Sequence, residues 1–260
     1  MTTYLDAILA YHRAAAVADT RPLDELIAAT ADLPAARGFA AALRASDPLG
    51  VISEVKRRSP SKGDLHVDLD AAALASEYEA GGAACCSVLT DVEFFGGSIA
   101  DLQAARAAIS IPVLRKDFTV SPRDVVDARL MGADCVLLIV AALDDAELTD
   151  FLLLATEVGL DALVEVHDEE EAERALTAGA SVIGVNQRDL TTFEVDTNRA
   201  ARVGESLPPD VVRVAESGIS GPADIGVLVT AGFDAVLVGE SLVTHQGPGD
   251  GVRALIDAAR

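Results

Sequence analysis

The chain has 260 residues, half of them hydrophobic, and its 42 acidic residues outnumber its 20 basic residues, for a net charge of −22. So acidic a surface repels phosphodiester chains, which argues against a nucleic-acid partner. The longest apolar run, 135–143, is far shorter than the roughly 20 residues of a membrane helix, so we expect no membrane span.

The N-terminus and the cysteines predict a cytoplasmic protein. Residues 1–6 lack the basic segment and the apolar stretch of a secretory signal. Cys85, Cys86 and Cys135 form neither a disulfide framework nor a zinc-binding spacing, so we interpret them as buried thiols in a reducing compartment. The charge suggests a salt-rich cytoplasm, where screening makes self-repulsion tolerable. An acidic, arginine-preferring proteome is the alternative.

Residues 1–49 are rich in alanine and read as one to three helices, punctuated by Pro22 and Pro34. We expect this segment to be a helical extension packed on the domain that follows, residues 50–260. Its apolar residues at helical spacing are Leu5, Ile8 and Leu9, then Leu23, Leu26 and Ile27.

Residues 51–63 combine a strand-like run with a basic loop. Glu54 and Lys56 are two residues apart, so their side chains point to one face of the strand. The loop at 57–63 contains Ser59, Pro60 and several cationic residues, a composition suited to holding an anion. Taken alone, the stretch fits an exposed ion pair followed by a solvated basic loop slightly better than it fits an anion site. The chain has only three lysines, Lys56, Lys62 and Lys116, and such selective placement suggests a chemical role.

From residue 51 onward, short β-branched runs alternate with helical segments, which predicts a parallel sheet. The count of eight favours a closed (β/α)8 barrel of the TIM type, and a length near 260 residues suits a single barrel domain. An open doubly wound sheet is the alternative, but no Gly-x-Gly-x-x-Gly follows the first strand. Gly82, Gly132, Gly179 and Gly232 recur before even-numbered strands and are expected to end helices in the left-handed conformation. The expected strands are 51–56, 84–89, 112–115, 134–140, 162–166, 182–186, 211–215 and 235–239.

Charged and polar residues stand at the ends of six of these strands, where a barrel places its chemistry. Any one of them could be a satisfied core residue. Together they are hard to explain in that way, because each buried charge needs a partner, and we expect them to line one pocket. They include Glu54, Lys56, Lys116, Glu165, Asn186, Arg188, Glu216, Ser217 and Gly239.

The pocket residues divide into three roles. Ser217 and Gly218, together with Gly239, resemble the seat where such barrels hold a phosphate on backbone N–H groups, within reach of Lys56. Lys116 can donate a proton, and Glu165 can accept one if burial raises its pKa. Between them the strand end at 137–140 is apolar, which suits a flat aromatic substrate.

Two phenylalanines, Phe95 and Phe118, fall at the same rim, where they could equally be loop-covering hydrophobes. The four histidines do not cluster at ligand spacing, and no Asp/Glu/His set suggests a metal. No nucleotide-binding fingerprint is present either, so neither metal nor cofactor is expected. Asp168 to Glu171 are interpreted as acids that complement a helix N-terminus.

Over essentially its whole length the chain closely resembles the indole-3-glycerol phosphate synthase family of tryptophan biosynthesis. Five motifs in the same order carry the resemblance: SEVKRRSPS (53–61), VLRKDF (113–118), LVEVH (163–167), IGVNQRDL (183–190) and AESGI (215–219). The resemblance implies a cofactor-free carboxy-lyase that closes the ring of 1-(2-carboxyphenylamino)-1-deoxyribulose 5-phosphate, with loss of carbon dioxide and water.

The resemblance also implies roles for individual residues. Lys116 would be the general acid on the attacked carbonyl, Glu165 the general base in dehydration, and Lys56 an anion-binding group that can share the acid role. Glu54 would position the lysines and the substrate hydroxyls. The remaining substrate-binding residues would be Asn186 and Arg188 for the intermediate and its carboxylate, Ser217, Gly218 and Gly239 for phosphate, Pro60 and Phe118 near the anthranilate ring, and Ser59, Phe95 and Glu216.

Glu240 departs from the family pattern, where a small hydroxyl residue is common, so only a backbone contact is expected from that loop. Two other readings remain: a Schiff-base aldolase with Lys116 as nucleophile, and a sugar-phosphate-binding barrel without chemistry. The expected partner is the small-molecule substrate, and the expected state is a monomer. Other enzymes of the tryptophan pathway are compatible with the resemblance.

Overall fold

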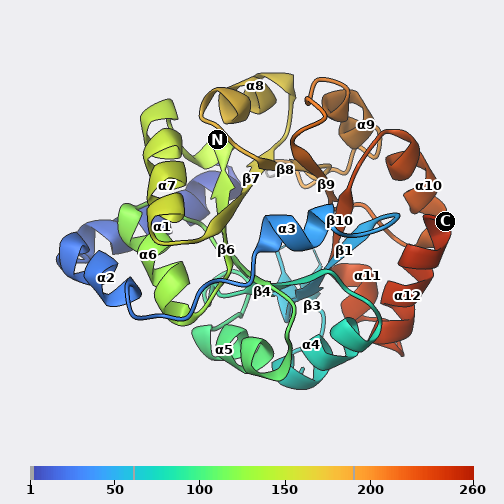
Figure 1. The fold of residues 1–260 in the computed structure, drawn as a ribbon, viewed down its shortest axis with the longest axis horizontal. Helices are drawn as coiled ribbons and strands as arrows, with labels where there is room; N and C mark the ends of the chain where they lie inside the picture. The colour runs from blue at the N-terminus through green and yellow to red at the C-terminus, as the bar shows by residue number, and fades with distance from the viewer. Residues whose placement is uncertain (1–2, 61, 190) are drawn as a thin grey trace.

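The computed structural model describes residues 3–60, 62–189 and 191–260, and its centre is a barrel of parallel strands closed by the pairing of β1 with both β4 and β10 (Figure 1). The predicted (β/α)8 barrel is confirmed, and each expected strand lies within one residue of its observed bounds. The barrel strands are β1 (Gly50–Val55), β4 (Cys85–Leu89), β5 (Val113–Lys116), β6 (Cys135–Ile139), β7 (Asp161–Val166), β8 (Val182–Asn186), β9 (Val212–Glu216) and β10 (Ala235–Val238).

Helices follow the strands and cover the outside of the barrel (Figure 1). The four glycines expected to end helices all have positive φ, between 80° and 98°. Asp168 caps α8 by accepting the backbone N–H of Glu171, as the acidic run predicted. The outer elements are α4 (Ala71–Ala80), α5 (Ile99–Ala108), α6 (Pro122–Met131), the 3-10 turn η1 (Val140–Ala142), α7 (Asp145–Glu157), α8 (Glu169–Thr177), α9 (Arg199–Gly204), α10 (Pro222–Thr230), α11 (Glu240–Val243) and α12 (Pro248–Ala258).

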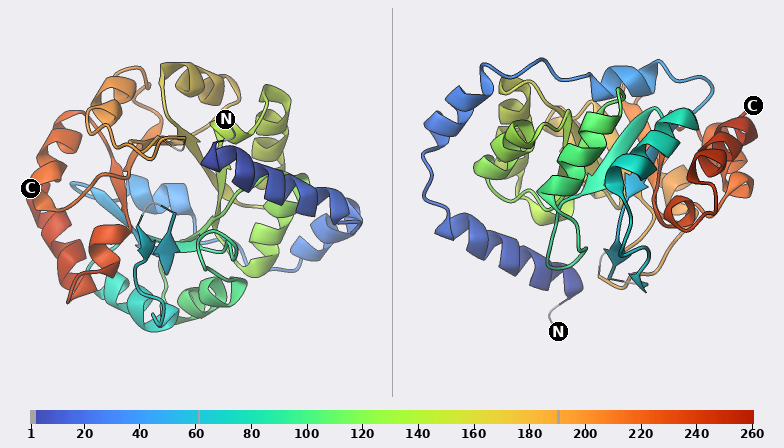
Figure 2. Two further views of the ribbon diagram at one scale, coloured as in Figure 1. Left: turned by 180° about the vertical axis from the view of Figure 1, so that it is seen from behind. Right: turned by 90° about the horizontal axis from the view of Figure 1, so that it is seen from below.

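Three helices precede the barrel: α1 (Tyr4–Ala18), α2 (Leu23–Thr30) and α3 (Phe39–Arg44). Helices α1 and α3 lie at opposite ends of the barrel, and α2 packs on its outside beside α6 (Figure 1). Figure 2 shows α3 over one end of the barrel and α1 across the opposite end, where the strands finish. Phe39 of α3 is fully buried, as expected for a helix that closes the amino-terminal end of the sheet. Helix α1 therefore lies on the face where a barrel carries its chemistry.

The basic loop differs from the prediction. It contains a short antiparallel hairpin, β2 (Arg58–Ser59) with β3 (Gly63–Asp64). Its two arginines have partners within the protein. Arg57 pairs with Asp101 at 2.6 Å, and Arg58 donates to the carbonyl oxygen of Glu93. The suggestion that this loop suits an anion therefore does not extend to its arginines, because acceptors within the protein satisfy them. Ser61 lies outside the described residues.

All three cysteines are buried free thiols, as predicted. Burial and the neighbouring Glu54 raise the pKa of Cys86 to about 12. Among the described residues, no helix combines the length and apolar character needed to cross a membrane.

The charge imbalance predicts a protein stabilised by salt. We expect the midpoint of thermal unfolding to rise by several degrees between 0.1 M and 1 M KCl, because the Debye length falls from about 10 Å to about 3 Å and the repulsion of a net charge of −22 is screened. A KCl series followed by circular dichroism checks this. A maximum in stability at the lowest salt would reject the salt-rich cytoplasm.

Candidate active site

The carboxyl ends of the strands surround a cavity of about 620 Å3. The topology brings every predicted site residue to this one cavity, although the residues come from seven of the eight barrel strands and the loops that follow them. These lining residues are Glu54, Lys56, Ser59, Pro60, Phe95, Lys116, Phe118, Glu165, Asn186, Arg188, Glu216, Ser217, Gly218 and Gly239. Their chemical roles stay predictions.

Lys116 is the centre of the charged network in this cavity. Its Nζ lies 3.0 Å from Oε2 of Glu165 and 3.7 Å from Oε2 of Glu216. The other oxygen of Glu165, Oε1, accepts a hydrogen bond from Nδ2 of Asn186 at 3.0 Å. The expected acid and base, which come from β5 and β7, are therefore in direct contact above β6, whose Leu137 and Ile139 line the cavity.

The network sets the protonation states of these groups. Burial by itself lowers the pKa of Lys116, but the carboxylates of Glu165, Glu216 and Glu54 raise it above its ordinary value. Burial by itself raises the pKa of Glu165, but Lys116, His167 and Asn186 lower it below the usual range. The expectation of a raised pKa for Glu165 is therefore wrong in the free protein, because a close ammonium outweighs desolvation. Burial and the nearby Glu165 raise the pKa of Glu216 instead.

A second ion pair lies on β1. Nζ of Lys56 is 2.6 Å from Oε1 of Glu54, which confirms that the two side chains share a face. Gly239 leaves room for this pair, since a Cβ there would stand 2.3 Å from Oε1 of Glu54 and 2.9 Å from Nζ of Lys56. Lys56 and the turn after β10 therefore meet, as expected for neighbouring strands.

The turn after β9 has an unusual backbone. Ser217 and Gly218 adopt consecutive positive φ values of 63° and 71°, a conformation that is costly for a non-glycine residue and is often kept for function. Gln187 supports the turn through a hydrogen bond from Nε2 to the carbonyl oxygen of Ser217, at 2.8 Å. Across the same end of the cavity, Nζ of Lys62 lies 3.7 Å from Oε1 of Glu240 and partly offsets the negative charge of this carboxylate, which would repel a phosphate.

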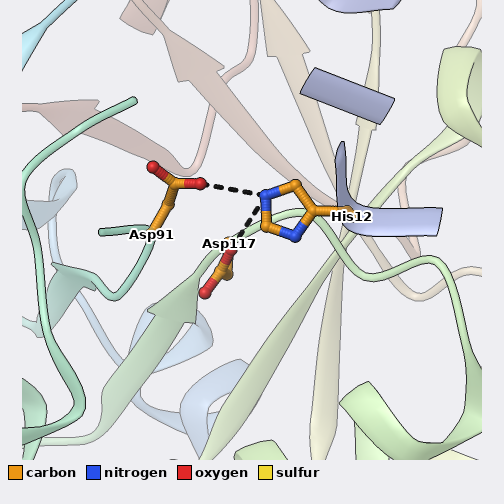
Figure 3. Close-up of side chains that lie close together, drawn as sticks. All are labelled: His12, Asp91 and Asp117. Atoms are coloured by element: carbon orange, nitrogen blue, oxygen red, sulfur yellow. Dashed lines mark hydrogen bonds and ion pairs between the residues drawn. The ribbon is translucent and has the colours of Figure 1, made fainter. Parts of the chain in front are cut away.

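The aromatic wall of the cavity consists of Phe95 and Phe118, whose ring centroids are 6.2 Å apart. The imidazole of His12 packs on Phe118 at 5.4 Å, and its Nε2 lies 2.9 Å from Oδ2 of Asp91 (Figure 3). Oδ1 of Asp91 accepts the backbone N–H groups of Phe94 and Phe95. Through His12 and Asp91, helix α1 is therefore hydrogen-bonded to the loop after β4, which contains Phe95 of the aromatic wall.

This arrangement was not predicted. His12, Asp91 and Asp117 offer ligand atoms within 4.8 Å of one another, so the expectation that no histidine joins such a set was wrong. Each carboxylate is already occupied by protein donors: Asp117 accepts from Thr90 and Arg115, and Asp91 from two backbone amides and His12. We therefore interpret the set as a hydrogen-bonded anchor. Burial alone would raise the pKa of Asp91, but these donors lower it.

Further residues line the cavity without having been predicted. Most are apolar or small hydroxyl residues, in strands, loops and a short helix, and lie outside the motifs on which the prediction was based. They include Leu89, Phe193, Val195, Thr197, Ser220, Leu237, Ser241 and Thr244.

The anchor predicts a selective effect on substrate binding. His12→Ala should raise KM about three- to tenfold, with a smaller change in kcat, because losing one part-buried hydrogen bond of about 1 kcal/mol loosens the aromatic wall. Steady-state kinetics measures both constants. Arg13→Ala is the matched control, since Arg13 ties the same helix to Glu147 at 2.8 Å, away from the wall. Equal increases in KM for both variants would contradict a local role for His12.

Fold and site together define a (β/α)8-barrel enzyme whose cavity holds a buried lysine–glutamate ion pair beside an aromatic wall and a glycine-containing turn. A family model described as indole-3-glycerol phosphate synthase matches residues 5–255. The chain is 55% identical over 236 residues to the indole-3-glycerol phosphate synthase of Micrococcus luteus, covering 89% of this chain and 87% of that protein. It is 53% identical over 236 residues to that of Streptomyces griseus, with 91% and 87% covered. The chain belongs to the indole-3-glycerol phosphate synthase family.

A more distant likeness concerns the fold alone. The solved structure of a thiamine phosphate pyrophosphorylase from Pyrococcus furiosus matches with a TM-score of 0.63 at 16% sequence identity, covering 81% of this chain and 95% of that one.

Proposed function

We propose that the chain converts 1-(2-carboxyphenylamino)-1-deoxyribulose 5-phosphate into indole-3-glycerol phosphate, releasing carbon dioxide and water in tryptophan biosynthesis, with Lys116 as general acid and Glu165 as general base. The observation that carries the assignment is the 3.0 Å contact between Lys116 and Glu165 inside the cavity. A lysine and a glutamate that touch can each serve one proton transfer on a substrate placed above them.

In the ring-closing step, the aromatic carbon attacks the ketone carbon and the carbonyl oxygen gains charge. Lys116 is suited to this step because its pKa is raised, so it is protonated at neutral pH and donates to that oxygen. The ketone becomes a hydroxyl and Lys116 becomes a neutral amine. Loss of carbon dioxide then restores the aromatic ring.

In the dehydration step, Glu165 removes a proton from the new ring while the hydroxyl leaves as water. Lys56, on the opposite side of the cavity, is the candidate donor to that hydroxyl. Lys116 has then lost one proton and Glu165 has gained one. Transfer across their 3.0 Å contact returns both groups to their starting states, and Lys56 recovers its proton from solvent.

The remaining lining residues fit the rest of the substrate. The turn at Ser217 and Gly218, with Gly239 after the neighbouring strand β10, presents backbone that can approach a phosphate closely. Arg188 and Asn186 are the candidates to bind the carboxylate and the intermediate, and the backbone N–H of Arg188 donates to the side-chain Oδ1 of Asn186 at 3.0 Å. The aromatic wall, with Pro60 and Ser59 at the hairpin, is placed for the anthranilate ring.

Indole fluorescence tests this function directly. The chain has no tryptophan, so a signal that grows when purified protein meets the substrate must come from product. We expect it to grow, with one carbon dioxide released per indole formed. Folded protein that leaves intact substrate unchanged at both low and molar KCl would overturn the proposal. Borohydride trapping of a covalent adduct on Lys116 would favour the aldolase instead.

We also propose that the enzyme is a monomer of the cytoplasm, with residues 1–49 folded as an extension on the barrel. The support for a monomer is that the exposed large hydrophobic residues are spread over separate elements, including Val17 on α1, Leu153 on α7 and Val227 on α10. Light scattering during gel filtration measures the mass. A dimer mass of twice 26.9 kDa would overturn this part of the proposal.

A further inference from the structure

His167 stands immediately behind the proposed base and has no part in the chemistry described above. It follows β7, two residues after Glu165, and its imidazole lies between two carboxylates. Nδ1 is 3.0 Å from Oε2 of Glu171, and Nε2 is 3.7 Å from Oε1 of Glu165. The ring therefore connects the first turn of α8 with the base.

The orientation of this ring is fixed by the helix. Oε2 of Glu171 accepts both Nδ1 of His167 and the backbone N–H of the same residue, the latter at 2.7 Å. Asp168, the N-cap of α8, holds Glu171 in turn through its backbone N–H at 2.9 Å. Nε2 is buried and, among the described residues, has no hydrogen-bond partner. A ring held in this way on one side presents its other nitrogen to Glu165.

Three buried glutamates line the cavity: Glu54 is paired with Lys56, and the other two, Glu165 and Glu216, have unequal surroundings. Glu165 and Glu216 are each 1% exposed and share the ammonium of Lys116. Two buried carboxylates beside one cation cannot both ionise without a large penalty, so one of them tends to hold a proton. Asn186 and His167 face Glu165, whereas Oε1 of Glu216 has no hydrogen-bond partner in the described part of the chain.

We propose that His167, as an imidazolium held by Glu171, is a positioning residue that keeps Glu165 ionised and thereby decides which of the two glutamates beside Lys116 is the base. This inference rests on the proposed function, in which Glu165 is that base. It assigns the proton of the pair to Glu216.

The charged groups around His167 agree with this role. Glu165 on β7 and Glu171 on α8 favour the imidazolium, and Arg199 on α9 opposes it. Burial by itself lowers the pKa of His167, but the two carboxylates raise it above its ordinary value. The imidazolium of His167 therefore provides a positive charge beside Glu165 at the pH at which Glu165 must be ionised to accept a proton.

The pH dependence of kcat tests the inference, with His167→Asn as the main variant. An asparagine amide can still meet Glu171 but places nothing where Nε2 faces Glu165. We expect the acidic limb of the profile to move up by about one pH unit, so that kcat falls about tenfold on that limb and recovers at higher pH, with KM unchanged. Glu171→Gln should move the limb in the same direction by less, because it weakens the imidazolium without removing it.

Two further variants, His66→Asn and Glu165→Gln, distinguish failure of this inference from failure of the proposed function. His66→Asn alters an exposed histidine away from the cavity lining and should leave the profile unchanged. If Glu165→Gln is inactive at every pH while the profiles of both His167→Asn and Glu171→Gln superimpose on wild type, the inference is overturned and the proposed function stands. If Glu165→Gln turns over normally, the base assignment fails and the inference fails with it. Should His167→Asn not fold, Glu171→Gln decides alone.

Discussion

Lys116→Met should lower kcat by about 10²-fold or more, since a positioned general acid contributes typically that much. Lys116 lines the cavity, and its Nζ lies 3.0 Å from Glu165 and 3.7 Å from Glu216. Methionine keeps the length of the chain but has neither the proton nor the charge. Indole fluorescence under saturating substrate measures the loss, and carbon dioxide release should fall in parallel because the ring-closing step comes first.

Lys116→Arg separates the charge of this residue from its acidity. A guanidinium can keep ion pairs with Glu165 and Glu216, but its pKa above 12 makes it a poor proton donor. We expect Lys116→Arg to unfold near the wild-type temperature and still to lose most of its turnover. Near wild-type kcat in either variant would remove Lys116 from the acid role. A Lys116→Arg variant much more active than Lys116→Met would assign the effect to charge alone.

Glu165→Gln should lower the rate of indole formation by about 10²-fold or more, because it removes the general base rather than the general acid. Glutamine can still accept from Asn186 or contact Lys116, but it cannot take up the ring proton in dehydration. If Glu165 serves only the later step, a single turnover should still release up to one equivalent of carbon dioxide per active site without indole. Rapid-quench measurement of carbon dioxide beside indole fluorescence tests this separation.

The control for Glu165→Gln is Glu157→Gln, the same change at an exposed position at the end of α7, which should leave both signals unchanged. Loss of carbon dioxide release together with indole would place Glu165 in the first step as well. Wild-type indole formation by Glu165→Gln would transfer the base role to Glu216, the other buried carboxylate on Lys116.

Much of this molecule could be predicted from local sequence because the local signals and the barrel agree. Short β-branched runs between helical segments identified the strands, since each strand is buried and needs apolar residues throughout. The site followed from one geometric rule: the carboxyl ends of parallel strands in a barrel meet at one face, so polar residues at those ends must share a cavity. Glu54 and Lys56 met on one face for the same reason, the two-residue period of a strand.

The tertiary structure alone decided which groups touch and how that contact changes them. His12 and Asp91 are 79 positions apart and belong to segments with no pattern in common, so only packing of α1 across the barrel joins them. Lys116 and Glu165 were expected at one rim, but their 3.0 Å contact reverses the expected direction of the Glu165 pKa. Burial can be anticipated from sequence, whereas a Coulomb interaction depends on the distance between charges, and only the folded chain sets that distance.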